Sequence, residues 1–255
     1  MNQAAWVRER ERPFVRNAED WCNQVHQQQN WYLTDFLTPR EQYLTTSVAV
    51  KNGLVNESFG GYTGCERQRM LLMPDNWYPT AEDFAVDCLQ LTAIAGEIAH
   101  KDVLGSVLGL GLHRKMVGDI VVDDATAYLF VTHTMGQYIY DHLHQVGRAT
   151  VSVARPSQIP ALPLPNYQPV DISVPSLRLD AVVARACQLS RGKSQETVER
   201  GAVTLNFTEA SNGDEVQIGD ILSVRGFGRI KILEALGTSR RDKLRLRIGV
   251  LRSNM

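Results

Sequence analysis

Two cations follow a helix-capping serine in the C-terminal third of the chain, at positions that favour phosphate binding. Arg191 and Lys193 come just after Ser190, whose hydroxyl is a good N-cap for a predicted helix. The helix macrodipole favours acids in a first turn, so two cations there are unfavourable on their own. A helix N-terminus that presents free N–H groups beside cations is a good phosphate site. The alternative is a pair of solvated surface charges.

Residues 176–206 supply the elements that position these cations. The apolar residues of a first predicted helix recur close to helical spacing and are Leu179, Val182, Val183, Ala186 and Leu189. The second helix starts after Ser190, and Gly201 is a good residue to end it. A short strand is predicted to follow. The stretch therefore predicts two short helices and a strand.

Two predicted antiparallel strands near the C-terminus carry further cations. They cover residues 229–236 and 243–251, and apolar and basic side chains alternate along both. One face of the pair is expected to hold Arg229, Lys231, Lys243, Arg245 and Arg247, with no acid. Solvated sheet faces usually mix charges of both signs, and like charges on neighbouring strands repel. The pattern favours a nucleic-acid surface over an ordinary solvated face.

Charge is distributed unevenly along the 255 residues, although the net charge is only −1. Residues 1–170 hold 13 Lys and Arg against 18 Asp and Glu, a balance of −5. Residues 171–255 hold 14 against 10, a balance of +4. A basic C-terminal third on an acidic body indicates a local site for a polyanion.

The spacing of reactive residues argues against several kinds of chemistry. The four cysteines are scattered without a CxxC pair, which argues against a zinc site or a disulfide framework. The glycine-rich run 105–111 fits neither nucleotide-binding pattern, and the histidines are dispersed. The sequence lacks a nucleophile elbow and a Cys–His signature. We therefore predict no catalytic residue, no metal site and no cofactor.

The order of predicted elements indicates an α+β fold with several domains. Residues 1–80 are interpreted as a small N-terminal α+β domain. Residues 81–155 follow the βαββαβ order of ferredoxin-like or RRM-like domains. Residues 156–175 hold six of the ten prolines and are interpreted as a stiff linker or an edge strand. Residues 176–255 make up the C-terminal domain.

Local signals predict individual elements in the first two domains. Thr38, Pro39 and Glu41 form a capping box that predicts a helix start. Residues 135–146 are expected to form a helix of the second domain. The strand expected at 127–131 lacks the aromatic signature on which RNA-recognition motifs stack bases, so base stacking is not assigned to it.

Residues 176–206 also resemble the S4 RNA-binding domain. The matching positions are Arg178-Leu-Asp180, Ser190-Arg191 and Val198-x-x-Gly201-x-Val203-x-Leu205-Asn206. Thr197 departs from the pattern, which usually has a large aliphatic residue there. The Arg-Leu-Asp run also resembles the catalytic motif of pseudouridine synthases, but the residues after it do not. Asp180 is therefore interpreted as a first-turn acid that favours the helix dipole.

The resemblance extends over nearly the whole chain to the YlmH family of RNA-binding proteins. The further matching segments are Phe36-Leu-x-Pro-Arg-Glu41, Gly60-Gly-Tyr62 with Glu66-Arg67, His100-Lys-Asp-x-Leu-Gly105, Leu108-Gly-Leu-Gly111 and Gly118-Asp-Ile120. A branch of this family found in cyanobacteria and plastids, labelled "photosystem II S4 domain protein", is similar in length.

The resemblance implies a non-enzymatic protein that binds structured RNA, either rRNA or tRNA. The resemblance also implies that the protein acts on the large ribosomal subunit in translation quality control. We expect a cytoplasmic monomer, or a stromal one in an organelle, with no DNA binding and no membrane insertion. The expected RNA contacts are Arg178, Arg185, Ser190, Arg191, Lys193, Ser194, Arg200, Arg229, Lys231, Lys243, Arg245 and Arg247.

Two other functions remain open from the sequence. One is an RNA-modifying enzyme of the pseudouridine-synthase type, with an active site in residues 81–155. The other is an interaction factor in photosystem II assembly or cell division, whose partners survive nuclease treatment.

Overall fold

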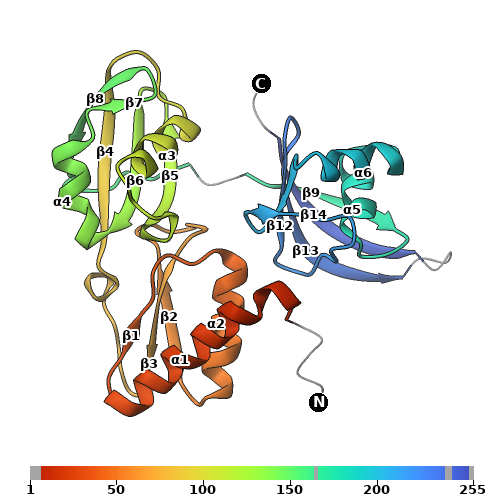
Figure 1. The fold of residues 1–255 in the computed structure, drawn as a ribbon, viewed down its shortest axis with the longest axis horizontal. Coiled ribbons are helices and arrows are strands. Elements are labelled where there is room, and N and C mark those ends of the chain that lie inside the picture. The colour runs from red at the N-terminus through yellow and green to blue at the C-terminus, as the bar shows by residue number, and fades with distance from the viewer. Residues whose placement is uncertain (1–6, 164–165, 239–242, 253–255) are drawn as a thin grey trace. The chain divides into compact units, whose positions relative to one another are not determined.

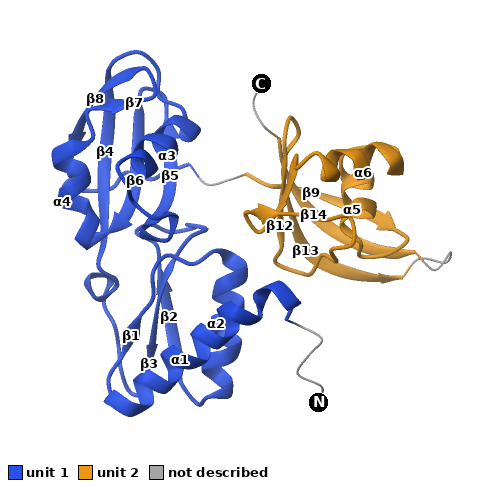
Figure 2. Cartoon of the chain, in the orientation of Figure 1, with its two compact units in different colours: residues 1–164 blue, residues 165–255 orange. Residues whose placement is uncertain are grey.

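A computed structural model of the 255-residue chain describes residues 7–163, 166–238 and 243–252. The chain divides into two compact units, residues 1–164 (unit 1) and residues 165–255 (unit 2) (Figure 1, Figure 2). Within the described residues, unit 1 holds two β-sheets and unit 2 holds one. No helix in these ranges is long and apolar enough to cross a membrane.

The N-terminal part of unit 1 packs two helices against a three-stranded antiparallel sheet. Its elements are η1 (Glu9–Glu11), α1 (Arg12–Gln28), β1 (Tyr32–Leu33), α2 (Pro39–Lys51), β2 (Val55–Phe59) and β3 (Arg69–Met73). The strand order is β1-β3-β2, so β3 lies in the centre. Cys22 of α1 and Val48 of α2 are buried with Leu72 of β3, which removes apolar surface from water and holds the helices on the sheet.

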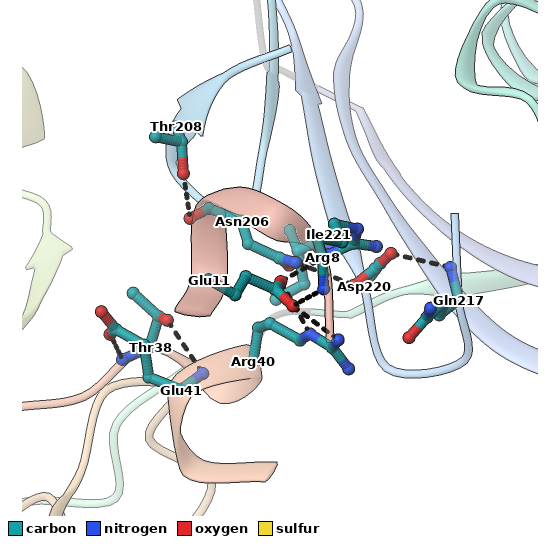
Figure 3. Close-up of polar contacts among 10 residues, drawn as sticks. All are labelled: Arg8, Glu11, Thr38, Arg40, Glu41, Asn206, Thr208, Gln217, Asp220 and Ile221. Carbon is teal, nitrogen blue, oxygen red and sulfur yellow. Dashed lines mark hydrogen bonds and ion pairs between the residues drawn. The ribbon is translucent and has the colours of Figure 1, made fainter. Parts of the chain in front are cut away.

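Helix α2 begins where the sequence predicts. The Thr38 hydroxyl accepts a hydrogen bond from the Glu41 N–H at 3.3 Å, and the Glu41 carboxylate accepts one from the Thr38 N–H at 2.7 Å. Pro39 lies in the first turn, where a missing N–H costs nothing. The capping box is therefore confirmed. The Arg40 guanidinium lies 2.9 Å from the Glu11 carboxylate and so ties α2 to η1. Figure 3 shows this contact beside the capping box.

The second sheet of unit 1 has five strands and two covering helices. Its elements are η2 (Ala81–Phe84), β4 (Val86–Ala95), α3 (His100–Gly109), η3 (Arg114–Met116), β5 (Val117–Asp123), β6 (Thr126–Thr132), α4 (His133–His142), β7 (Gln145–Val146) and β8 (Ala149–Ala154). The order is β5-β6-β4-β8-β7, and all neighbours are antiparallel. Val107 of α3 and Ile139 of α4 pack with Leu91 and Leu129 on one face.

One predicted helix boundary is wrong. The helix expected over residues 135–146 ends at His142, and Gln145 and Val146 form the short strand β7 instead. The chain becomes extended at Leu143, and Gly147 turns it back at a φ of +57° so that β7 pairs with β8. Tertiary strand pairing overrides local helix propensity at this point.

The sheet face opposite α3 and α4 is closed inside unit 1. Tyr128 and Phe130 of β6 lie on that face and are only 9% and 0% exposed. Phe36, Tyr62 and Leu162 pack against them, and the rings of Tyr62 and Phe130 stack with centroids 4.8 Å apart. RNA-recognition motifs stack bases on the corresponding face. Neither ring of β6 is available to a base here.

A buried arginine joins the two sheets of unit 1. Arg67 is 5% exposed; its Nε donates to the Val117 carbonyl at 3.0 Å, and its Nη2 donates to the Phe36 carbonyl at 2.9 Å. Asp119 of β5 accepts from the N–H groups of Glu66 and Arg67 at 2.7 and 3.0 Å. Burial lowers the pKa of Arg67. The carbonyl partners nonetheless satisfy its donors, so the loop before β3 is fixed to the second sheet.

Unit 2 is a six-stranded antiparallel sheet with two helices on one face. Its elements are β9 (Gln168–Val174), α5 (Leu179–Ala186), α6 (Arg191–Glu199), β10 (Val203–Leu205), β11 (Thr208–Glu209), β12 (Ile221–Val224), β13 (Gly228–Thr238) and β14 (Leu244–Arg252). The strand order is β11-β10-β12-β13-β14-β9. Val183 of α5 and Val198 of α6 are buried with Ile230 of β13 and Ile248 of β14, so this face forms the core.

The end of the proline-rich segment belongs to this sheet. Strand β9 pairs antiparallel with β14, from Gln168 opposite Val250 to Val174 opposite Leu244. It lies at an edge, where Pro169 is tolerated because an edge strand leaves half of its N–H groups unpaired. The segment therefore contributes a strand to unit 2.

Candidate nucleic-acid interface

The first turn of α6 forms as the sequence predicts. The Ser190 hydroxyl accepts a hydrogen bond from the Lys193 N–H at 3.3 Å, which confirms the N-cap. Gly201 follows the helix with a φ of +65°, the left-handed conformation that ends many helices. Arg191 and Lys193 are exposed in the first turn of this helix.

A buried carboxylate organises the cations around this turn. Asp180, in the first turn of α5, is 0% exposed. Its oxygens accept hydrogen bonds from Arg178 Nε at 3.1 Å, from Arg191 Nε at 3.3 Å and from Gln195 Nε2 at 2.9 Å. Burial alone raises the pKa of Asp180, but the hydrogen bonds from Arg178, Gln195 and Arg191 outweigh burial and lower the pKa.

Asp180 therefore does more than complement the helix dipole. It lies in the first turn, as predicted, but it also joins α5 to α6 by holding one arginine on each side. The side chains of Arg178 and Arg191 remain 42% and 55% exposed, so part of each guanidinium is open to solvent. One carboxylate against two arginines leaves a net positive charge with fixed geometry.

A pocket of about 520 Å³ lies beside this ion-paired group. Its lining comes from the end of β9, from α5 and from the loop between the helices: Ser173, Pro175, Ala181, Ala184, Arg185, Gln188, Leu189 and Arg191. Two of the cations predicted from the sequence, Arg185 and Arg191, line the pocket together. Its volume is within the about 300–1,000 Å³ typical of ligand sites. The arrangement presents two guanidinium groups at the rim of a concave surface.

The other predicted residues of the helix pair differ in whether their side chains are exposed and able to contact RNA. Lys193 is exposed, and Arg200 is exposed with its Nε donating to the Glu196 carbonyl at 3.3 Å. Ser194 is 0% exposed, and its hydroxyl donates to the Asp180 backbone carbonyl at 2.7 Å. The expectation that Ser194 contacts RNA is therefore corrected, because its hydroxyl is used inside the helix pair.

The basic strand residues lie on the other face of the sheet. Ile230 and Ile248 point into the core under α5 and α6, so their neighbours Arg229, Lys231 and Arg247 point away from the helices. The helix cations and the strand cations therefore occupy opposite faces, with the edge strand β9 between them. The expected RNA contacts therefore do not all share one face of the sheet. Lys243 is exposed just before β14, and residues 239–242 before it lie outside the described residues.

That outward face also carries acids, which corrects a second expectation. Asp171 of β9 lies 2.9 Å from Arg247 and 4.0 Å from Arg245, and Glu234 of β13 lies 3.3 Å from Arg247. The hydrogen bond from Arg247 lowers the pKa of Asp171. The sequence interpretation missed Asp171 because it treated residues 156–175 as a linker or an edge strand without pairing them with β14. Part of the strand charge is therefore neutralised within the sheet.

Two residues that contact the predicted cations or their carboxylate partner were missed from the sequence. Gln195 donates to Asp180, and its place five residues after the N-cap Ser190 is the only local signal for that role. Phe207 is 38% exposed at the tip of a hairpin, with the Arg229 guanidinium 5.8 Å from its ring centroid. Two-residue hairpin turns favour Asn-Gly, and here Phe207 stands in place of the glycine. That unusual residue is the signal in the sequence that could have identified this position.

Metal-binding and redox groups do not gather in the described ranges. No group of three or more His, Cys, Asp or Glu residues there is placed to hold a metal ion. Burial raises the pKa of the Cys22 and Cys187 thiols to about 11 and that of Cys88 to about 12. These thiols are therefore protonated at neutral pH and poorly reactive.

Comparisons with known proteins identify an RNA-binding domain in unit 1 and relatives of the whole chain. Residues 79–158 match the family model described as "Putative RNA-binding domain in YlmH". The "Ribosome-associated protein quality control protein P2" of Bacillus subtilis (strain 168) is 34% identical over 246 residues. That alignment covers 94% of this chain and 95% of the relative.

A solved structure is also similar. The "Cell division protein ylmH from Streptococcus pneumoniae" superposes with a TM-score of 0.56 at 27% sequence identity. The superposition covers 61% of this chain and 95% of that structure. The matches place residues 79–158 in a class of RNA-binding domains. The whole chain belongs to the YlmH family, as its sequence motifs indicate.

Proposed function

We propose that this chain is a non-enzymatic protein that binds structured RNA of the ribosome, rRNA or tRNA, and acts in translation quality control. The observation that carries the proposal is the helix pair α5–α6. There, Asp180 fixes Arg178 and Arg191, and Arg185 lines the adjoining pocket. Fixed guanidinium groups beside a helix N-terminus suit phosphate oxygens. The name of the B. subtilis relative, a ribosome-associated quality control protein, supports the ribosomal assignment.

We interpret unit 2 as an S4-type RNA-binding domain over residues 176–255. The two short helices, the buried Asp180 and the strand at Val203–Leu205 are consistent with the motif. For residues 81–155 the observed strand order supports a ferredoxin-like interpretation, with residues 1–80 as a separate N-terminal α+β domain. A helix-pair site of this kind reads RNA shape and backbone more than base identity.

The remaining parts of the proposal concern where the protein works. We infer a cytoplasmic monomer, stromal in an organelle, with the large ribosomal subunit as its partner. Binding to RNA rather than DNA is proposed because the residue 79–158 match is to an RNA-binding domain.

The buried state of Asp180 argues against a catalytic role for the Arg178-Leu-Asp180 motif. A catalytic aspartate must reach a nucleotide, whereas this side chain is 0% exposed and is occupied by three side-chain donors. Asp180 packs α5 against α6 and holds the two arginines in place. This structural role accounts for the Arg-Leu-Asp motif without any catalytic function.

Ribosome co-sedimentation tests the proposal. The variant is R191E/K193E, which reverses two exposed charges at the first turn of α6. The matched control is R16E/K51E, which makes the same charge change at exposed positions of unit 1. We expect R191E/K193E to be lost from the ribosomal fraction at physiological salt while R16E/K51E stays. Wild-type binding should weaken steeply as salt rises, because phosphate contacts release counterions.

If R191E/K193E pellets with ribosomes as completely as the wild type, the placement of the site on α6 is wrong. Equal losses in both double variants would show that overall charge, rather than this site, controls binding. Circular dichroism of each variant shows whether the fold is retained.

The similar S. pneumoniae structure is that of a cell division protein, which supports a second candidate function, an interaction factor in cell division. This alternative predicts protein partners that remain bound after nuclease treatment. The ribosomal proposal predicts that nuclease releases the partners. Affinity capture with and without nuclease separates the two functions.

A further inference from the structure

We propose that Phe207 stacks on an unpaired base of the bound RNA, while Arg229 beside it contacts a neighbouring phosphate. This inference rests on the proposed RNA-binding function. It adds a contact residue that lies on neither helix of the α5–α6 pair.

Phe207 occupies a backbone conformation that large residues seldom adopt. Leu205 of β10 pairs with Thr208 of β11, so Asn206 and Phe207 alone make the connection. Their φ angles are +51° and +67°, both in the left-handed region. Two-residue hairpin turns of this kind strongly favour Asn-Gly. Asn206 fits that preference and Phe207 does not. A side chain retained against backbone preference indicates a use for the side chain itself.

The turn is held rigidly by groups other than the phenyl ring. The Asn206 amide donates to the Asp220 carboxylate at 2.8 Å, and the Asn206 side-chain oxygen accepts from the Ile221 N–H at 3.0 Å. Asp220 is 0% exposed and also accepts from the Gln217 N–H at 2.7 Å. Figure 3 shows this network around Asn206. The ring of Phe207 is therefore presented from a fixed turn that it does not need to stabilise.

The surroundings of the ring suit a nucleotide better than an apolar protein surface. Phe207 is 38% exposed, and the Arg229 guanidinium lies 5.8 Å from its centroid. Arg229 and Lys231 alternate with buried residues along β13, so both point outward. Glu209, the acid of this hairpin, lies against Gly201 at the end of α6. An aromatic platform beside cations is the combination that binds a base and its phosphate.

RNA binding by full-length variants tests this proposal. The variants are Phe207→Gly and Phe207→Trp. The probes are an RNA hairpin with 2-aminopurine in its loop and a blunt RNA duplex of the same stem. We expect Phe207→Gly to lower affinity for the hairpin by about tenfold, as for the loss of one base–aromatic stack. It should leave duplex affinity unchanged. Phe207→Trp should keep hairpin affinity and quench 2-aminopurine fluorescence on binding.

The same variants exclude a folding artefact. Glycine suits the left-handed turn, so Phe207→Gly should keep or raise the urea midpoint of unit 2. Unchanged hairpin binding by Phe207→Gly, with binding lost in R191E/K193E, would refute the stacking role and leave the proposed function standing. If the wild type binds neither probe, both proposals fail. If Phe207→Gly loses a nuclease-resistant protein partner but keeps RNA affinity, the ring contacts protein and the stacking role is wrong.

Discussion

Replacing Asp180 by asparagine removes the charge that holds the helix pair together while keeping the size of the side chain. Asp180 is 0% exposed and accepts from Arg178, Arg191 and Gln195. Breaking a fully buried ion pair costs about 3–5 kcal/mol. Both arginines are about half exposed, and solvent screens such partners, so the expected loss is smaller, about 2–3 kcal/mol. With a typical urea dependence, the midpoint of unit 2 should fall by about 1–2 M.

The distribution of tryptophan provides an internal control for this measurement. All four tryptophans lie in the first 77 residues, so tryptophan fluorescence follows unit 1 only. Hydrogen exchange of peptides from residues 165–255 follows unit 2 in the same full-length protein. D180N should lower the urea midpoint of unit 2 detected by hydrogen exchange. It should leave the midpoint of unit 1 detected by tryptophan fluorescence unchanged. Equal stability of D180N and wild type at pH 7 would refute the ionised, structural role of Asp180.

The pH dependence gives a second check of the same residue. The pKa of Asp180 is lowered in the folded state from an ordinary value of 3.8. Its contribution is therefore fully present above that value and is lost as the pH falls through the folded pKa. The stability difference between wild type and D180N should be constant from neutral pH down to about pH 5 and should vanish in strong acid.

Two further predictions concern the outward sheet face and the packing of unit 1. Asp171→Asn removes one of the two carboxylates paired with Arg247, so RNA affinity should rise and the slope of log affinity against log salt should steepen by up to about 0.9 per cation that gains a phosphate contact. An unchanged slope in filter binding would remove this face from the RNA contact set. Gly61→Ala should destabilise unit 1 by about 3 kcal/mol in a fluorescence-detected urea titration, because Gly61 has a φ of +104° and an added Cβ would overlap the Phe130 ring. Gly53→Ala, with a φ of +70° and open space around it, isolates the backbone contribution and should cost about 1 kcal/mol. Similar losses in both glycine variants would contradict the close-packing explanation.

Helix starts were predictable because capping is local chemistry. Thr38 and Ser190 each accept a hydrogen bond from an N–H three residues later, as their sequence positions indicate. Gly201 ends α6 in the left-handed conformation for the same kind of local reason. The position of Arg191 and Lys193 in the first turn of α6 was predictable for the same reason, because the N-cap residue determines which residues form the first turn.

The environment of each charge depended on contacts that no local pattern contains. Asp171 neutralises Arg247 only because β9 pairs with β14, and that pairing joins residues far apart in the chain. The burial of Asp180 likewise depends on the docking of α6 on α5. Alternation along β13 and β14 predicted which residues share a face, but not that α5 and α6 cover the opposite one. The sequence therefore predicted the cations but not which of them are paired.

The most direct test of the central claim is to map RNA-crosslinked peptides of the full-length protein bound to ribosomes. After ultraviolet crosslinking and digestion, mass spectrometry identifies the peptides that carry nucleotides. An RNA-binding helix pair predicts crosslinks concentrated in residues 176–201, with Arg185 and the first turn of α6 among them, and their loss in R191E/K193E. Crosslinks confined to unit 1, with none in residues 165–255, would contradict it.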